Sequence, residues 1–254
     1  MTKITMSAAM IGFVIILAVG TNIVEAEDKD LFEATFYNDL GMVGSLLEIG
    51  ADVNAKDKDG KTALMFAFGR ANDFEIANLL LDKGADVNAR DKDGKTVLIL
   101  ASRRGPNAVK LLIDRGADVN ARDNNGTTAL MDTTIHDVAE LLLEKGADIN
   151  ARDNNGRTAL MKCPYDLEVL KLLLAKGADV NAKDKNGKTA LMEALGKHSI
   201  QGVRLLLDNG ADVNAKDKNG KTALVMASND TELVKLLLDK GADVNTKDKD
   251  NKTD

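Results

Sequence analysis

The chain has 254 residues, of which 44% are hydrophobic and 29% charged, so it has enough apolar material for a core and enough charge for a solvated surface. Its formal net charge of −6 argues against general affinity for nucleic acid, because phosphate binding needs an excess of clustered Lys and Arg. Trp is absent and aromatic residues make up 3%, which also disfavours a platform for stacked bases.

The first 26 residues have the features of a targeting segment. Lys3 supplies a positive end, residues 6–19 are apolar, and Val24 and Ala26 are small residues of the kind that a signal peptidase recognises. We therefore predict a signal peptide over residues 1–26 that is cleaved after Ala26, and a protein that acts in the periplasm or outside the cell. The alternative is an uncleaved membrane anchor over residues 6–24, close to the roughly 20 apolar residues that span a bilayer.

A repeated stretch organises the rest of the chain. Residues 50–65 read G-A-D-V-N-A-K-D-K-D-G-K-T-A-L-M, and closely similar stretches begin at Gly84, Gly116, Gly146, Gly177, Gly210 and Gly241. The gaps between these glycines are 34, 32, 30, 31, 33 and 31 residues. Self-similarity at a period of about 33 predicts units that stack and bury one another's apolar faces.

Two blocks in each unit carry a family resemblance. Residues 57–64 and 79–88 resemble the ankyrin repeat, whose pattern is D-x-x-G-x-T-P-L-H followed by L-L-x-x-G-A-D-x-N, and the resemblance covers about residues 28–250. It implies an all-α repeat solenoid of helix-turn-helix units joined by β-hairpin-like loops. One departure is systematic, because Ala63/Met65 and their equivalents replace the family's Pro and His. We therefore expect the joints between units to depend more on packing.

The domain boundaries follow from the repeats. We predict an N-terminal capping repeat over residues 27–56 and a C-terminal tail over residues 248–254. Between them lie six ankyrin repeats: 57–90, 91–122, 123–152, 153–183, 184–216 and 217–247.

Each repeat has predicted turn and capping residues. The Asp that begins each loop tip is expected to hydrogen-bond the turn, and the Gly three residues later to adopt a left-handed backbone. A Thr then caps the first helix, and a Gly follows the end of the second. The capping threonines are Thr62, Thr96, Thr128, Thr158, Thr189 and Thr222. The deletion over residues 132–140 and Pro164 predict the shortest first helices in those two repeats.

The C-terminal end lacks a polar closing helix in this pattern. We therefore expect the last apolar face to be partly exposed and to be available for self-association. That face comprises Leu224, Val225, Leu233, Leu236 and Leu237.

The sequence contains no recognisable catalytic, metal or cofactor motif. The Asp-rich tips lack the first ligand of a calcium-binding loop, and His136 and His198 are too far apart for ligand spacing. Cys163, the single cysteine, excludes an intramolecular disulfide and is expected to be buried and inert. We predict a protein that is not an enzyme and has no cofactor.

In the ankyrin family, partners bind the concave side formed by loop tips and first-helix ends. The resemblance therefore implies a protein–protein interaction scaffold, whose variable residues at these places form a basic and aromatic strip suited to a protein with an acidic segment. The predicted partner-binding residues are Tyr37, Phe66, Arg70, Arg103, Arg104, His136, Lys162, Tyr165 and Lys197. The alternative for these residues is a set of solvated, variable helix ends.

Two other functions are compatible with the same sequence. One is an inhibitor or immunity-like protein that occludes an envelope enzyme or toxin. The other is a structural element that self-assembles through the uncapped C-terminal face into a homo-oligomer. Repeat style and export signal together favour a bacterial source.

Overall fold

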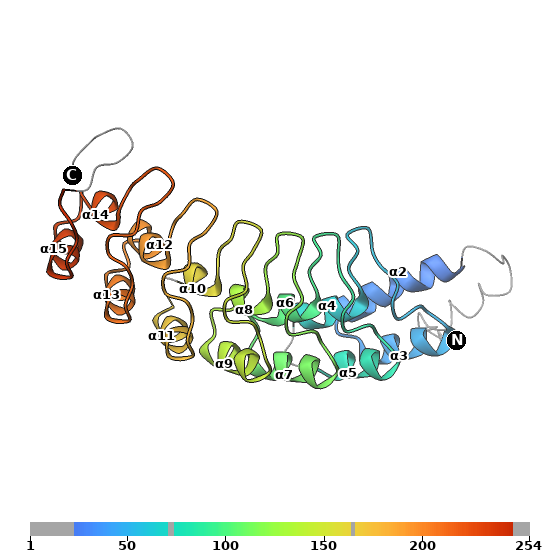
Figure 1. Ribbon diagram of the computed structural model, residues 1–254. Helices are drawn as coiled ribbons and strands as arrows, with labels where there is room; N and C mark the ends of the chain where they lie inside the picture. The colour runs from blue at the N-terminus through green and yellow to red at the C-terminus, as the bar shows by residue number, and fades with distance from the viewer. Residues whose placement is uncertain (1–22, 71–73, 164–165, 246–254) are drawn as a thin grey trace, which may run out of the picture. The chain divides into compact units, whose positions relative to one another are not determined.

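A computed structural model describes residues 23–70, 74–163 and 166–245 of the chain (Figure 1). Contacts divide the chain into two units, residues 1–118 and residues 119–254. Within the described ranges the regular structure is helical, and the β-type pairing is an isolated antiparallel bridge between Arg90 and Thr96. The all-α repeat fold predicted from the sequence is confirmed.

The first unit contains three described helix pairs. Their first helices, α2, α4 and α6, pack side by side, and α3 packs on α5. The bounds are α2 Ile23–Phe36, α3 Leu40–Ile49, α4 Ala63–Arg70, α5 Glu75–Asp82, α6 Val97–Ala101 and α7 Pro106–Asp114.

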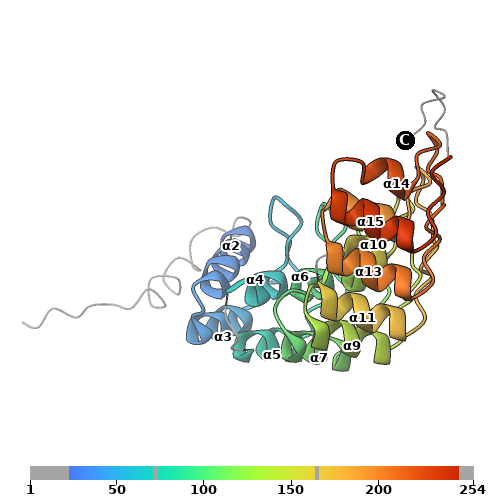
Figure 2. The ribbon, with the colours of Figure 1, turned by 90° about the vertical axis from the view of Figure 1, so that its left-hand side faces the viewer.

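The second unit contains four described helix pairs. Its first helices form one layer through the successive contacts α8–α10, α10–α12 and α12–α14, while α9, α11 and α13 form the other layer (Figure 2). The bounds are α8 Ala129–Asp132, α9 His136–Glu144, α10 Ala159–Lys162, α11 Leu167–Ala175, α12 Ala190–Gly196, α13 Ile200–Asp208, α14 Ala223–Met226 and α15 Thr231–Asp239.

The core of each unit lies between the two helical layers. The middle residue of the apolar triplet in each second helix has no solvent exposure: Leu80, Leu112, Leu142, Leu173, Leu206 and Leu237. Each buried leucine contributes about 1.5–3 kcal/mol of hydrophobic stabilisation. Since a lone pair of helices cannot cover both of its faces, this burial depends on neighbouring repeats.

Loops join neighbouring repeats through hydrogen bonds as well as packing. The backbone N–H of Lys92 donates to the carbonyl of Asp59 at 2.9 Å, and the N–H of Lys218 donates to the carbonyl of Asn186 at 2.8 Å. The loop tips therefore approach one another closely. A β-carbon on Gly187 would lie 2.9 Å from the backbone nitrogen of Lys218.

The predicted turn chemistry is confirmed at the loop tips. One carboxylate oxygen of Asp57 accepts hydrogen bonds from the backbone N–H groups of Asp59 and Lys61, each at 2.8 Å. Gly60 in this turn has φ of +76°, which is the left-handed region that glycine tolerates best.

The threonine caps are only partly as predicted. The hydroxyl oxygens of Thr96, Thr128, Thr189 and Thr222 accept a hydrogen bond from the N–H three residues later. Thr62 and Thr158 are buried, and their hydroxyls have no hydrogen-bond partner. The prediction of a side-chain cap is therefore wrong for these two, although the helices still begin at the following alanine.

First-helix length follows the deletions that the sequence shows. The helices α8 and α10 have 4 residues each, as predicted from the shortened interval and from Pro164. The helix α14 is equally short, which the sequence analysis did not anticipate. Pro164 itself lies outside the described residues.

The prediction of an exposed C-terminal face is wrong for most of its members. Leu224, Leu233, Leu236 and Leu237 are between 0% and 6% exposed, while Val225 is half-buried. Packing within the last helix pair and against α12 accounts for this burial. The apolar surface on which the self-assembly alternative depended is therefore largely covered.

The predicted targeting segment, with the anchor alternative over residues 6–24, lies almost entirely outside the described residues. The helix α2 begins at Ile23, before the predicted cleavage point at Ala26, and continues to Phe36. In the parts of the chain that the structure describes, none of the helices combines the length and apolar character required to cross a bilayer.

Candidate functional site

The predicted partner-binding residues are divided between the two units. The first unit holds Tyr37, Phe66, Arg70, Arg103 and Arg104, and the second holds His136, Lys162, Tyr165 and Lys197. Tyr165 and the side chain of Arg70 are outside the described part of the structure. The residues of the predicted strip therefore form two separate sets, one in each unit.

Two of the predicted partner-binding residues in the first unit are aromatic, and the ring of each contacts a neighbouring ring. The ring of Tyr37 is 73% exposed and meets the ring of Phe36 edge-on, with centroids 5.3 Å apart. Phe66 on α4 is half-buried against Phe32 on α2, with ring centroids 5.8 Å apart. Tyr37 is thus the member of this group that can offer a large surface to a partner.

Two exposed arginines lie in the turn between α6 and α7. Arg103 and Arg104 follow Ser102, whose hydroxyl donates to the carbonyl of Ile99 at 2.8 Å and closes the end of the helix. Gly105, with φ of +123°, then reverses the chain into α7. The fold therefore holds both guanidinium groups at the end of a first helix, as the sequence predicts.

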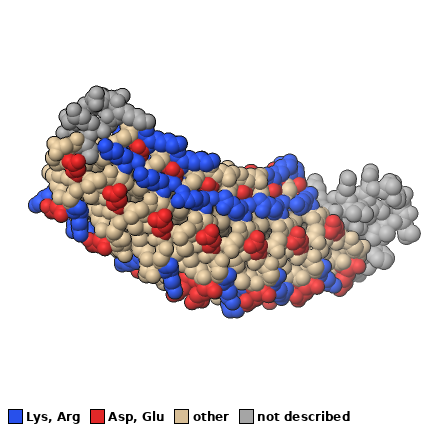
Figure 3. Space-filling view, viewed as in Figure 1, with Lys and Arg blue, Asp and Glu red and all other residues tan. Residues whose placement is uncertain are grey.

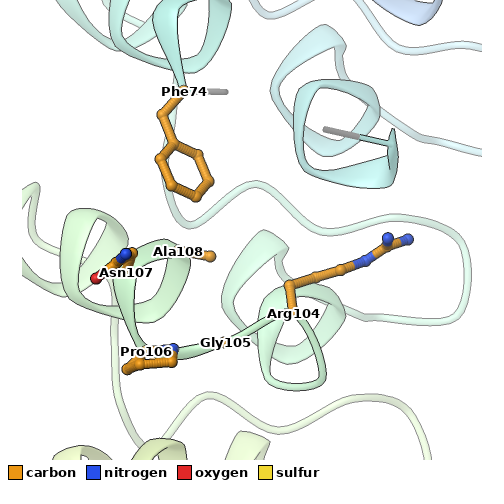
Figure 4. A pocket seen from close by; sticks show the side chains of 6 residues that line it. All are labelled: Phe74, Arg104, Gly105, Pro106, Asn107 and Ala108. Atoms are coloured by element: carbon orange, nitrogen blue, oxygen red, sulfur yellow. The ribbon is translucent and has the colours of Figure 1, made fainter. Parts of the chain in front are cut away.

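A small hollow adjoins these arginines. Its lining comprises Phe74, Arg104, Gly105, Pro106, Asn107 and Ala108, and its volume is about 250 Å³. Figure 4 shows the Phe74 ring pointing toward the start of α7 and the Arg104 side chain directed away from that ring. The volume is below the roughly 300–1,000 Å³ typical of small-molecule pockets.

Lys162 in the second unit has partners within the chain. Its ammonium group lies 3.4 Å from the hydroxyl of Thr127 and 3.9 Å from a carboxylate oxygen of Asp153. Burial lowers the pKa of Lys162, and the charge of Asp153 opposes that shift. Lys162 was predicted from its position in the repeat to bind a partner, and these contacts within the chain were not predicted.

Asp153 is the centre of this buried charge cluster. Its side chain is 1% exposed and lies 3.0 Å from the guanidinium of Arg157. Burial raises the pKa of Asp153, but hydrogen bonds from the backbone N–H groups of Arg157 and Asn155, together with the Arg157 charge, outweigh burial and hold the pKa below its usual value. Because these groups satisfy the carboxylate, the cluster stabilises the turn and is not assigned a catalytic role.

The other predicted residues of the second unit lie at helix ends. His136 begins α9, and its ring nitrogen lies 3.1 Å from the carboxylate of Asp137. Lys197 directly follows the last residue of α12 and is exposed. These residues lie at the helix ends that the sequence predicts, whereas the side chains of Phe66 and Lys162 on the first helices are half-buried.

A group of exposed lysines on the loops of the second unit was not predicted from the sequence. Figure 3 shows Lys and Arg side chains gathered along the loop ends. Lys185 and Lys218 occupy the same position in consecutive tips, and both are exposed. The repeated K-D-K-N-G-K pattern of residues 183–188 and 216–221 was a signal that could have revealed them.

The described residues contain no group of three or more His, Cys, Asp or Glu side chains suited to a metal ion. Cys163 is buried, as predicted, and burial raises the pKa of its thiol to about 12.

The fold and its repeats define a class of stacked helix-pair proteins. The family model for ankyrin repeats, which contains three copies of the repeat, matches residues 31–123, 106–184 and 162–248. The chain therefore belongs to the ankyrin-repeat family. Members of this class are generally interaction modules without enzymatic activity, so the chain is a scaffold for protein–protein interaction.

A solved structure supports the same conclusion. The crystal structure of the ankyrin repeat domain of Bcl-3, a member of the IkappaB protein family, is 31% identical in sequence, with a TM-score of 0.70. The match covers 83% of this chain and 97% of the Bcl-3 chain. A comparison with curated protein sequences gives no match.

Proposed function

We propose that the protein is an exported, non-enzymatic scaffold that holds a protein partner on the concave face typical of ankyrin repeats. The observation that carries this proposal is the exposed pair Arg103 and Arg104 beside the hollow at Phe74. Arginine is enriched where binding energy concentrates in protein interfaces. An acidic segment of the partner complements this pair, and an adjacent side chain enters the hollow.

A capture experiment tests the proposal. The full chain and its Arg103→Ala/Arg104→Ala variant are used to isolate partners from the envelope fraction of the source cell. We expect one dominant protein with the wild type and its loss with the variant. Lys145→Ala/Lys176→Ala is the matched control, because it removes two exposed charges from the ends of second helices.

The result that contradicts this proposal is equal capture by the arginine variant and by the wild type. Retained helix content in circular dichroism ensures that a loss of capture reports the surface and not the fold. The proposed export of the protein is tested separately, by measuring the molecular mass of the protein in each cell fraction. A mature protein that begins at Glu27 supports the signal peptide, and the intact mass in the membrane fraction supports the anchor.

A further inference from the structure

The loop tips of the fifth and sixth repeats differ in charge from the other tips. Residues 183–188 and 216–221 each contain three lysines and one aspartate, a formal charge of +2. The equivalent segments 56–61 and 90–95 of the first unit carry two aspartates against three basic residues, a formal charge of +1. The difference arises at one position, where Asn186 and Asn219 replace Asp59 and Asp93.

The aspartate that remains in each of these tips is turned into its own loop. One carboxylate oxygen of Asp184 accepts from the backbone N–H groups of Asn186 at 2.7 Å and Lys188 at 2.8 Å. Asp217 makes the same two bonds, at 2.7 Å and 2.9 Å. These carboxylates are half-buried, so the outer surface of the two tips is dominated by ammonium groups.

Several of these lysines have no acidic partner among the described residues. Lys188 is an exception, because its ammonium group lies 3.6 Å from the carboxylate of Glu193. The ammonium group of Lys183 donates to the backbone carbonyl of Lys216, a neutral acceptor that does not compensate the charge of Lys183. Lys185 and Lys218 are exposed and have no side-chain hydrogen bond or ion pair in the described structure.

The two tips are held in register. The backbone N–H of Lys218 donates to the carbonyl of Asn186 at 2.8 Å, so consecutive tips are directly hydrogen-bonded. The side-chain oxygen of Asn181 also accepts from the N–H of Asp212 at the base of the same loops. The cationic surface is therefore carried on a fixed backbone, which reduces the entropy lost when a ligand binds.

We propose that the tips at residues 183–188 and 216–221 form a docking surface for an acidic, extended segment of a protein partner. This inference rests on the proposed scaffold function and assigns it a second contact surface, which lies within the second unit. Flexible ammonium groups on neighbouring loops suit carboxylates along a peptide. The net charge of −6 and the scarcity of aromatic side chains disfavour nucleic acid as the ligand.

The test measures binding of a fluorescent oligoglutamate to the full chain at low salt. We expect Lys185→Glu/Lys218→Glu to weaken binding by about tenfold or more, because four units of charge change at exposed sites. The matched control is Lys58→Glu/Lys92→Glu, which makes the same change at the same loop positions in the first unit. This control should weaken binding much less.

A second pair of variants tests the origin of the charge difference. Asn186→Asp/Asn219→Asp gives the second-unit tips the residues found at Asp59 and Asp93, so the loop geometry is retained while binding of oligoglutamate weakens. Asp59→Asn/Asp93→Asn makes the reciprocal change and should strengthen binding at the first unit. Circular dichroism and thermal unfolding confirm that each variant is folded.

Two results overturn the inference. One is equal oligoglutamate binding by the wild type and the Lys185→Glu/Lys218→Glu variant, and the other is tighter binding of an oligonucleotide of equal charge. If partner capture still requires Arg103 and Arg104 in either case, the scaffold proposal stands. If capture no longer requires these arginines while oligoglutamate binding is normal, the scaffold proposal is contradicted and the docking surface on the loops is still supported.

Discussion

The side-chain oxygen of Asn181 accepts a hydrogen bond from the backbone N–H of Asp212 at 2.8 Å, 31 residues along the chain. The amide nitrogen of the same Asn181 donates to the carbonyl of Gly210 at 3.0 Å. The side chain of Asn181 therefore hydrogen-bonds both the carbonyl of Gly210 after the end of α13 and the N–H of Asp212 in the loop that follows. Asn54, Asn88, Asn150 and Asn214 also accept from the Asp of the following repeat.

Asn181→Ala should lower the free energy of unfolding by about 1–2 kcal/mol, because two inter-repeat hydrogen bonds are lost. Urea unfolding monitored by circular dichroism measures the change. Asn245→Ala is the control, since Asn245 occupies the same position but its side chain makes no hydrogen bond among the described residues. Equal losses in the two variants would show that the bonds contribute nothing.

The glycines of the loop tips and of the helix ends should respond differently to alanine. Gly187 and Gly210 both have positive φ, of +78° and +86°. A β-carbon on Gly187 meets the backbone of Lys218 at 2.9 Å, whereas one on Gly210 meets nothing within 4 Å. Gly210→Ala should cost about 1 kcal/mol for backbone strain, and Gly187→Ala clearly more. Thermal unfolding of the two variants measures these losses of stability. A greater loss for Gly210→Ala than for Gly187→Ala would contradict the prediction.

The two kinds of buried threonine should also be distinguishable. The hydroxyl of Thr189 accepts from the N–H of Met192 at 3.4 Å, while the buried hydroxyl of Thr158 lacks a partner. Thr189→Val should destabilise by about 0.5–2 kcal/mol through loss of the cap. Thr158→Val should be neutral or stabilising, because a methyl group replaces an unsatisfied polar atom. Chemical unfolding of both variants tests this, and a larger loss for Thr158→Val would refute it.

Cys163 should resist thiol reagents while the protein is folded. Its thiol is buried and its pKa is raised to about 12 from an ordinary 9.0, so almost no thiolate exists at pH 8. Reaction with a chromogenic disulfide should begin only with urea unfolding. As pH rises, the thiol deprotonates in the unfolded state near pH 9 but in the folded state only near pH 12. The contribution of Cys163 to the free energy of unfolding therefore falls between these two pH values. Rapid labelling of the native protein would contradict the prediction.

Asp153 should contribute to the acid sensitivity of the fold. Because its folded pKa lies below the ordinary value of 3.8, its stabilising contribution is present above that pH and is lost as pH falls through the folded pKa. Asp153→Asn should therefore unfold more readily at neutral pH and show a smaller further loss on acidification. Unfolding measured across acidic pH tests this. Asp184→Asn serves as the control, since Asp184 is half-buried at the equivalent position.

The sequence predicted the architecture well because the repeat restricts the fold strongly. The Gly and the Asp at each loop tip and the Gly after each second helix have the structural roles expected of them, as at Asp57, Gly60 and Gly84. Residues such as Arg103 and Lys197 lie at helix ends for the same reason.

The failures concern packing details that a pattern does not specify. The Thr158 and Thr189 motifs are alike in sequence, but the hydroxyl of Thr189 accepts a hydrogen bond from the N–H of Met192 while the hydroxyl of Thr158 has no partner. Leu233 and its neighbours are buried by packing within the last helix pair and against α12, which the repeat pattern did not predict. The repeat pattern predicted Lys162 to be a surface residue, but its ammonium group lies 3.9 Å from the buried carboxylate of Asp153.

The loop bonds have an evolutionary consequence. Within each unit they run from one repeat to the adjacent one, as from Asn186 to Lys218, and they engage backbone groups that every repeat possesses. A gene encoding such a chain can therefore gain or lose a copy by unequal recombination without refitting distant positions. The length of the molecule, and with it the extent of surface offered to other proteins, is open to selection one copy at a time.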